Sequence, residues 1–178
     1  DAERGDLHCV RTFIAAGLGD TESTVEHADA AFAIASRHGL SGDGFDGVAA
    51  MVVKAHSWSG DWAAAELAAA RVTTDGQPSV ASIETSGALA NLEIFRGRLG
   101  AGIAHARRSR ELVAAGGRPA LSTESNGIAL LGLGLLERGD VSTAERLFRR
   151  LENTDQRARL PPRIFAHVGL SRIQHARG

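Results

Sequence analysis

Residues 128–151, IALLGLGLLERGDVSTAERLFRRL, form the stretch that decides the fold. The first nine residues are apolar or glycine, whereas from residue 141 the apolar residues recur at the three- to four-residue spacing of an amphipathic helix. The tripeptide Arg138-Gly139-Asp140 between the two parts suits a tight turn. The stretch therefore predicts two antiparallel helices joined by a short connection.

Weaker copies of this pattern recur along the chain. Turn glycines lie about 40 residues apart, at Gly19, Gly60, Gly97 and Gly139. Three of them precede an aspartate that suits the N-cap of the next helix, namely Asp20, Asp61 and Asp140, whereas Arg98 breaks the pattern. A repeat of this length is typical of helical arrays in which each unit buries its apolar face against its neighbours.

The pattern predicts four helical hairpins and the start of a fifth. They pair residues 6–17 with 22–38, 46–58 with 62–72, 80–96 with 99–115 and 122–138 with 141–151, and residues 163–176 begin the fifth. Residues 41–47 are predicted to be a loop, with Asp46 capping the helix that follows. We thus expect an all-α, antiparallel helix-hairpin solenoid of about nine helices in a single domain, residues 1–178. Because the sequence begins with Asp1 rather than Met, we expect a fragment of a larger protein.

The composition excludes several classes of protein. With 43% hydrophobic and 23% charged residues, the chain resembles an ordinary globular domain, and its abundant alanine and leucine favour helix. The longest apolar run, residues 127–136, covers only about half of the roughly 20 residues that a membrane span needs. The single cysteine, Cys9, excludes an internal disulfide framework, so we expect a cytoplasmic protein with no membrane contact.

The charge is distributed unevenly along the chain. Residues 1–95 hold 5 basic and 14 acidic side chains, whereas residues 96–178 hold 15 and 7, although the net charge of the whole chain is only −1. An array with ends of opposite sign can contact another copy or another domain end to end. The asymmetry has two explanations. One is a homo-oligomer or a contact with another domain, and the other is two charged faces that are only solvated.

The fourth unit carries a family resemblance. Its small and large positions match those of a tetratricopeptide repeat: Leu131, Gly132, Leu135, Gly139, Ala144 and Phe148. The longer period resembles the helical sensor domain of large LuxR-type bacterial transcription regulators, the maltose-regulator-like group. This resemblance implies a tetratricopeptide-like superhelix that binds a small-molecule effector or a protein. It also implies attached ATPase and DNA-binding domains outside this chain.

The sequence offers no catalytic or metal-binding motif. The seven histidines are scattered over five units without a pair at metal-binding spacing. A faint likeness to a calcium loop at Asp43-Gly44-Phe45-Asp46 lacks further oxygen ligands and a closing glutamate. We therefore expect no enzymatic activity, no cofactor and no metal.

Two sets of residues are candidates for binding. First helices of tetratricopeptide-like repeats line the concave surface, and the resemblance places eight polar or aromatic residues there: Lys54, Trp58, Glu84, Asn91, Asn126, Glu137, Arg172 and His175. Apolar residues lie between them, at Phe13, Ile94, Phe95 and Leu133. In a tightly wound array Ile94, Phe95 and Leu133 are alternatively core. Basic clusters mark two second helices, at Arg107, Arg108, Arg110, Arg146, Arg149 and Arg150.

The sequence thus predicts a ligand- or protein-binding helical-repeat segment of a bacterial transcription or signalling regulator. A scaffold or self-association module without a small-molecule ligand is the first alternative. Contact with nucleic acid through the basic C-terminal half is the second, although no stacking aromatics accompany the arginines. We expect no direct nucleic-acid binding.

Overall fold

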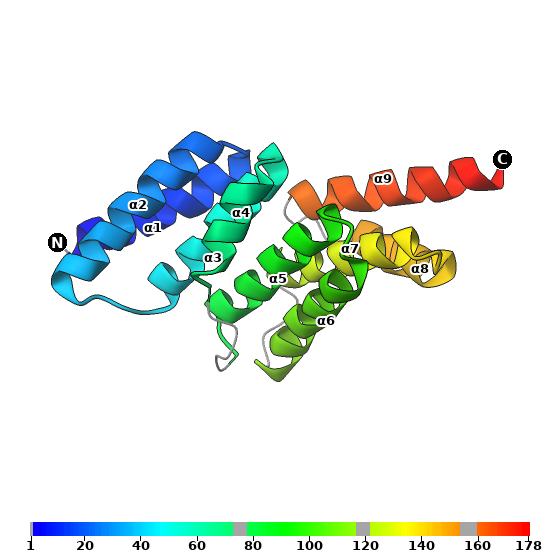
Figure 1. The fold of residues 1–178 in the computed structure, drawn as a ribbon. Coiled ribbons are helices and arrows are strands. Elements are labelled where there is room, and N and C mark those ends of the chain that lie inside the picture. Colours follow the sequence, from blue (N-terminus) through cyan, green and yellow to red (C-terminus); the bar gives the residue numbers. More distant parts are fainter. Residues whose placement is uncertain (1, 73–77, 117–121, 154–159) are drawn as a thin grey trace.

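A computed structural model describes residues 2–72, 78–116, 122–153 and 160–178 (Figure 1). Over these ranges the chain forms nine helices and no strand, which confirms the all-α prediction. Their bounds are α1 Ala2–Leu18, α2 Thr21–His38, α3 Asp43–Ser59, α4 Trp62–Ala69, α5 Val80–Phe95, α6 Leu99–Ala115, α7 Ser122–Glu137, α8 Val141–Asn153 and α9 Leu160–Arg177. None of these helices has both the length and the apolar character required to cross a membrane.

Successive helices pair along the chain. α1 packs on α2, α3 on α4, α5 on α6 and α7 on α8, so the described part of the chain holds four hairpins followed by α9. The first helices of the hairpins also pack on one another in sequence order, from α1 through α3, α5 and α7 to α9 (Figure 1). This row of first helices determines which side chains can face a common site.

The hairpin turns form as the sequence predicts. Gly19, Gly60, Gly97 and Gly139 all have positive φ angles, between 75° and 85°, which glycine adopts without steric cost. After three of these glycines an aspartate accepts a hydrogen bond from a backbone N–H of the next helix: Asp20 from Ser23 at 3.0 Å, Asp61 from Ala64 at 3.1 Å and Asp140 from Thr143 at 3.2 Å. Arg98 takes the same position without a capping side-chain bond.

The prediction of a loop over residues 41–47 was wrong from residue 43 onward. α3 begins at Asp43 with Gly42 at the N-cap, so Asp46 lies inside the helix and caps nothing. Two contacts with α1 explain the earlier start, because Phe45 packs against Gly5 and Gly47 against the ring of Phe13. Tertiary packing therefore overrides the loop-forming composition of this segment. Elsewhere the predicted bounds differ by a few residues: α1 and α9 begin earlier, and α4 ends at Ala69 rather than residue 72.

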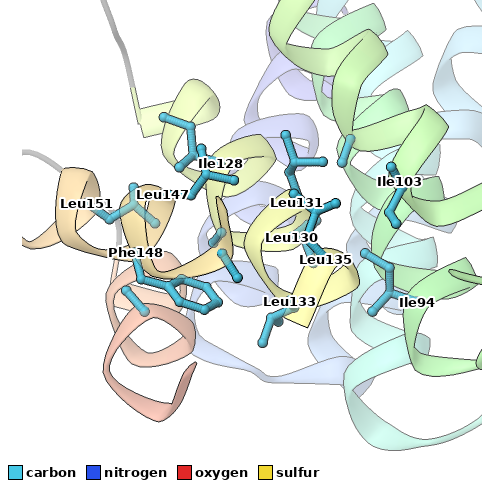
Figure 2. Close-up of a cluster of buried hydrophobic side chains, with 14 of the residues drawn as sticks. Ile94, Ile103, Ile128, Leu130, Leu131, Leu133, Leu135, Leu147, Phe148 and Leu151 are labelled. Atoms are coloured by element: carbon cyan, nitrogen blue, oxygen red, sulfur yellow. The ribbon is translucent and has the colours of Figure 1, made fainter. Parts of the chain in front are cut away.

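The largest hydrophobic core lies in the C-terminal half, between α5, α6, α7, α8 and α9 (Figure 2). Phe148 is fully buried there, and its ring occupies space that two glycines leave free. A Cβ atom on Gly132 would lie 2.5 Å from the ring, and one on Gly169 would lie 2.3 Å from it. The N-terminal half has two smaller clusters in which alanine predominates, one around Ala50 and Met51 and one around Ala28 and Ala31.

Candidate functional site

A half-open cavity of about 520 Å³ lies beside α1 and α3. Its walls come from four first helices, since α7 and α9 contribute one residue each. The lining residues are Val10, Phe13, Ile14, Ala16, Gly17, Leu18, Met51, Lys54, Trp58, Asn126 and Pro162. Ligand sites for small molecules typically have volumes of about 300–1,000 Å³ and mostly apolar walls with a few polar groups. The cavity meets both criteria.

The α1 wall of the cavity is aliphatic. Val10, Ile14 and Leu18 are 54%, 57% and 80% exposed, and Leu7 extends the same stripe by one turn. These residues recur every three or four positions, so they share one helix face. Phe13 anchors the helix from its buried side, because its ring packs over Gly47 of α3. An exposed aliphatic stripe beside a cavity is a surface that an apolar ligand would cover.

A buried ion pair borders the cavity. The ammonium of Lys54 on α3 donates a hydrogen bond to the carboxylate of Glu84 on α5, and the two side chains are only 5% and 2% exposed. Charged side chains are buried at this level only when they are paired. The packing of α3 on α5 brings the two residues together across 30 positions of sequence.

Two further residues with polar side chains, Trp58 and Asn126, contribute to the cavity lining. The indole Nε1–H of Trp58 is buried and has no hydrogen-bond partner within the described ranges. Asn126, near the start of α7, packs its amide nitrogen against Gly87 of α5, 3.0 Å from where a Cβ would lie. A buried donor without a partner is unusual in a folded protein and is commonly satisfied by water or a ligand.

The structure therefore brings together part of the predicted concave set. Lys54, Trp58 and Asn126 line one cavity with Phe13, and Glu84 joins them through its ion pair with Lys54. Asn91 lies two turns after Glu84 on the same face of α5, is 2% exposed, and neither polar atom of its amide has a hydrogen-bond partner in the described structure. Asn91 does not line the cavity.

The remaining predicted residues lie apart from this site. Glu137 accepts a hydrogen bond from Arg172, so this pair links α7 to α9, and the carboxylate raises the pKa of Arg172. His175 is exposed in the last turn of α9. Ile94 and Leu133 belong to the C-terminal core, as the alternative interpretation of these apolar residues predicted. Phe95 is 39% exposed and packs against Trp62 and Phe165.

The two basic clusters occupy separate helices, α6 and α8. Five of the six arginines are exposed, and Arg110 is half-buried. Several have acidic neighbours: Arg108 lies 3.8 Å from Glu111, and Arg149 donates to Glu145 at 2.8 Å. No packing between α6 and α8 occurs in the described part of the chain, so the two clusters do not merge into one basic groove there.

The histidines do not form a metal centre where the structure describes them. Across those ranges, no three side chains of histidine, cysteine, aspartate or glutamate come close enough to hold an ion. The rings of His8 and His27 pack at 5.5 Å between α1 and α2. Burial and the neighbouring His27 lower the pKa of His8, which favours its neutral form.

Sequence reasoning missed most of the apolar wall. Val10, Ile14 and Leu18 on α1, Met51 on α3 and Pro162 on α9 were not predicted to lie at the site. The spacing of the three α1 residues was a usable signal, because they share one face of the helix. No sequence signal brings Pro162 to α1, since this proximity depends on how the hairpins stack.

Comparison of the chain with protein-family models, with curated proteins and with solved structures finds no match.

Proposed function

We propose that this chain is a ligand-binding helical-repeat segment of a cytoplasmic bacterial transcription or signalling regulator. In this proposal the hairpins form a tetratricopeptide-like solenoid, and the cavity beside α1 and α3 binds a small-molecule effector. The cavity itself is the observation that carries the proposal, because its lining combines an exposed aliphatic wall with the aromatic ring of Trp58 and a buried lysine. No enzymatic step is part of this function.

The position of the cavity supports a sensing role. Its lining joins α1 and α3 to Asn126 of α7 and Pro162 of α9, and no packing of α1 on α7 or α9 occurs among the described helices. A ligand that contacts both sides would therefore join hairpins that the helix packing leaves apart. If the hairpins can adopt two relative positions, a ligand that binds one of them more tightly would shift the equilibrium toward that position. Domains attached to the hairpins would then move as well.

Native mass spectrometry of the purified protein, before and after incubation with a metabolite extract, tests this function. We expect a retained or acquired small molecule on the wild-type chain and its loss in Trp58→Ala. A matched control is Phe95→Ala, which removes a partly exposed aromatic ring outside the cavity. A bare monomer under all conditions, or equal ligand retention in both variants, would contradict the proposal.

Self-association is the second candidate function, and the exposed α1 stripe favours it. Leu7, Val10, Ile14 and Leu18 give an aliphatic surface in the acidic half of the chain, whereas the other half is basic. Sedimentation equilibrium at low and high salt distinguishes the two functions. Dimers that form without a ligand would favour a scaffold. Contact between the oppositely charged halves should weaken as salt rises, whereas contact through the aliphatic stripe should persist.

A further inference from the structure

Exposed aliphatic side chains concentrate on α1 and α9, the first and last helices of the row of first helices. Of the nine large hydrophobic residues that are exposed within the described ranges, six lie on these two helices: Leu7, Val10, Ile14 and Leu18 on α1, and Ile164 and Val168 on α9. In each helix they lie about half a turn away from the buried residues, such as Cys9 and Thr12 on α1 and Ala166 and Leu170 on α9. Both aliphatic faces therefore point away from the packed side of their own helix.

The two ends of the row lack helical neighbours that the interior of the row has. Among the described helices, α5 packs on α3, α4, α6 and α7, whereas α1 packs on α2 and α3 alone and α9 on α7 and α8 alone. In Figure 1, α1 lies at one end of the array and α9 extends to the other. Helical repeats bury their apolar faces against neighbouring units, so a second copy that continues the row would cover both faces.

The charge of the two halves selects the way in which two copies meet. The half that contains α1 holds 5 basic and 14 acidic side chains, and the half that contains α9 holds 15 basic and 7 acidic ones. A symmetric contact of α1 with α1 would bring two acidic halves together, and a contact of α9 with α9 two basic halves. Only contact of α9 with α1 brings halves of opposite sign together, and complementary charge favours this arrangement over the other two.

We propose that α9 of one copy of this chain packs on α1 of a second copy, so that the copies associate head to tail. Ile164 and Val168 of the first copy then cover the aliphatic stripe of the second. The inference rests on self-association, the second candidate function, because Val10 and Ile14 also line the cavity and an apolar ligand would cover the same surface. A head-to-tail contact leaves one free face at each end, so association continues into longer chains or closes into a ring.

Two variants of the full chain, one for each face, test the proposal. The α1 variant carries Val10→Gln and Ile14→Gln, and the α9 variant carries Ile164→Gln and Val168→Gln. All four side chains are about half exposed and glutamine suits a helix, so both variants should keep their fold, which circular dichroism checks. The matched control is Leu67→Gln, which removes an exposed leucine on α4, a helix that belongs to neither face.

Sedimentation equilibrium and native mass spectrometry measure the association. For the wild type and for Leu67→Gln we expect a mass that rises with concentration beyond the dimer. Each face variant by itself should associate about tenfold more weakly or less tightly still. An equimolar mixture of the two variants, one of them isotope-labelled, should recover the wild-type affinity but stop at a mixed dimer. The reason is that α9 of the α1 variant and α1 of the α9 variant are both intact.

The salt dependence of the wild type gives an independent measurement. Raising the salt concentration should weaken a head-to-tail contact, because it screens the attraction between halves of opposite sign, while the aliphatic contact persists. A symmetric contact between like-charged halves should instead become tighter as salt rises. Tighter association at high salt would therefore overturn the head-to-tail arrangement.

The mixing experiment separates failure of this inference from failure of self-association. Undiminished association of the α9 variant alone would indicate symmetric contact through α1 and overturn the inference, as would undiminished association of the α1 variant through α9. An equal loss in Leu67→Gln would show that neither face is specific. A wild type that stays monomeric at all concentrations would overturn self-association together with the inference and leave the α1 stripe to a ligand or another partner.

Discussion

Phe148 and Trp58 are large aromatic residues in the two halves of the molecule, and their surroundings differ. Phe148 on α8 is fully buried, and its ring occupies the space that a side chain at Gly132 or Gly169 would need. Trp58 on α3 is half-buried and lines a cavity of about 520 Å³, and its N–H has no hydrogen-bond partner among the residues that the structure describes. Helix packing therefore leaves no cavity at Phe148, because two glycines make room for its ring. At Trp58 a cavity remains, because no described helix covers the aliphatic residues of α1.

The first test of this comparison is Phe148→Ala, which should destabilise the protein most. Truncating a fully buried phenylalanine typically lowers the free energy of unfolding by about 3–5 kcal/mol, because a cavity replaces lost contacts. Urea denaturation followed by circular dichroism measures the change. The partly exposed Phe95 provides the control, since Phe95→Ala should cost less. Similar losses in the two variants would show that the complete burial of Phe148 between Gly132 and Gly169 adds little stability.

The second test concerns the buried Lys54–Glu84 ion pair, which borders the cavity. Lys54→Met or Glu84→Gln alone should lower the free energy of unfolding by roughly 3 kcal/mol, because each breaks a buried ion pair by removing one of its two charges. The double variant Lys54→Met/Glu84→Leu should recover most of that loss. A double-mutant cycle from denaturation curves gives the coupling. Additive losses would indicate that the two groups do not interact.

Two glycine-to-alanine substitutions test how tightly the two halves of the molecule are packed. Gly169→Ala places a methyl group against the ring of Phe148 and should cost about 1–3 kcal/mol. Gly17→Ala in α1 meets no atom within 4 Å and should instead stabilise the helix slightly. Thermal denaturation of both variants should show a lower melting temperature for Gly169→Ala and a slightly higher one for Gly17→Ala. A stabilising Gly169→Ala would mean that the close contact with Phe148 relaxes at little cost.

Trp58→Ala should separate binding from stability. We expect loss of ligand binding with a decrease of only about 1–2 kcal/mol in the free energy of unfolding, because part of the ring is already exposed. Calorimetric titration and denaturation on the same sample measure the two effects. Intact binding in this variant, or a loss as large as that of Phe148→Ala, would make Trp58 a core residue rather than a ligand contact.

The smallest effect should come from a helix cap. The hydrogen bond that Thr143 N–H donates to Asp140 lowers the pKa of that carboxyl group. A lowered pKa stabilises the folded state above the unfolded-chain pKa of about 3.9, and this contribution is lost as the pH falls through the folded-state pKa. Asp140→Ala should therefore lower the melting temperature at neutral pH, and the difference should shrink below about pH 4. A constant difference at all pH values would contradict an ionised cap.

Most of the helices could be predicted from sequence because their signals are local. A glycine in a left-handed conformation followed by a capping aspartate defines a turn by the conformations and hydrogen bonds of adjacent residues. The exception is the start of α3, where Phe45 and Gly47 contact α1 and extend the helix into a loop-like sequence. Such contacts link distant residues, so no local pattern records them.

The sequence by itself determined the helices and the turns that join them into hairpins, and so which helices form the row of first helices. It did not determine which parts of that row are open. Only the tertiary structure buries Ile94 and Leu133 in the core, pairs Lys54 with Glu84, and brings Pro162 near α1 to complete the cavity. Helical periodicity determines the direction of a side chain around its own axis, whereas burial depends on the relative positions of whole helices.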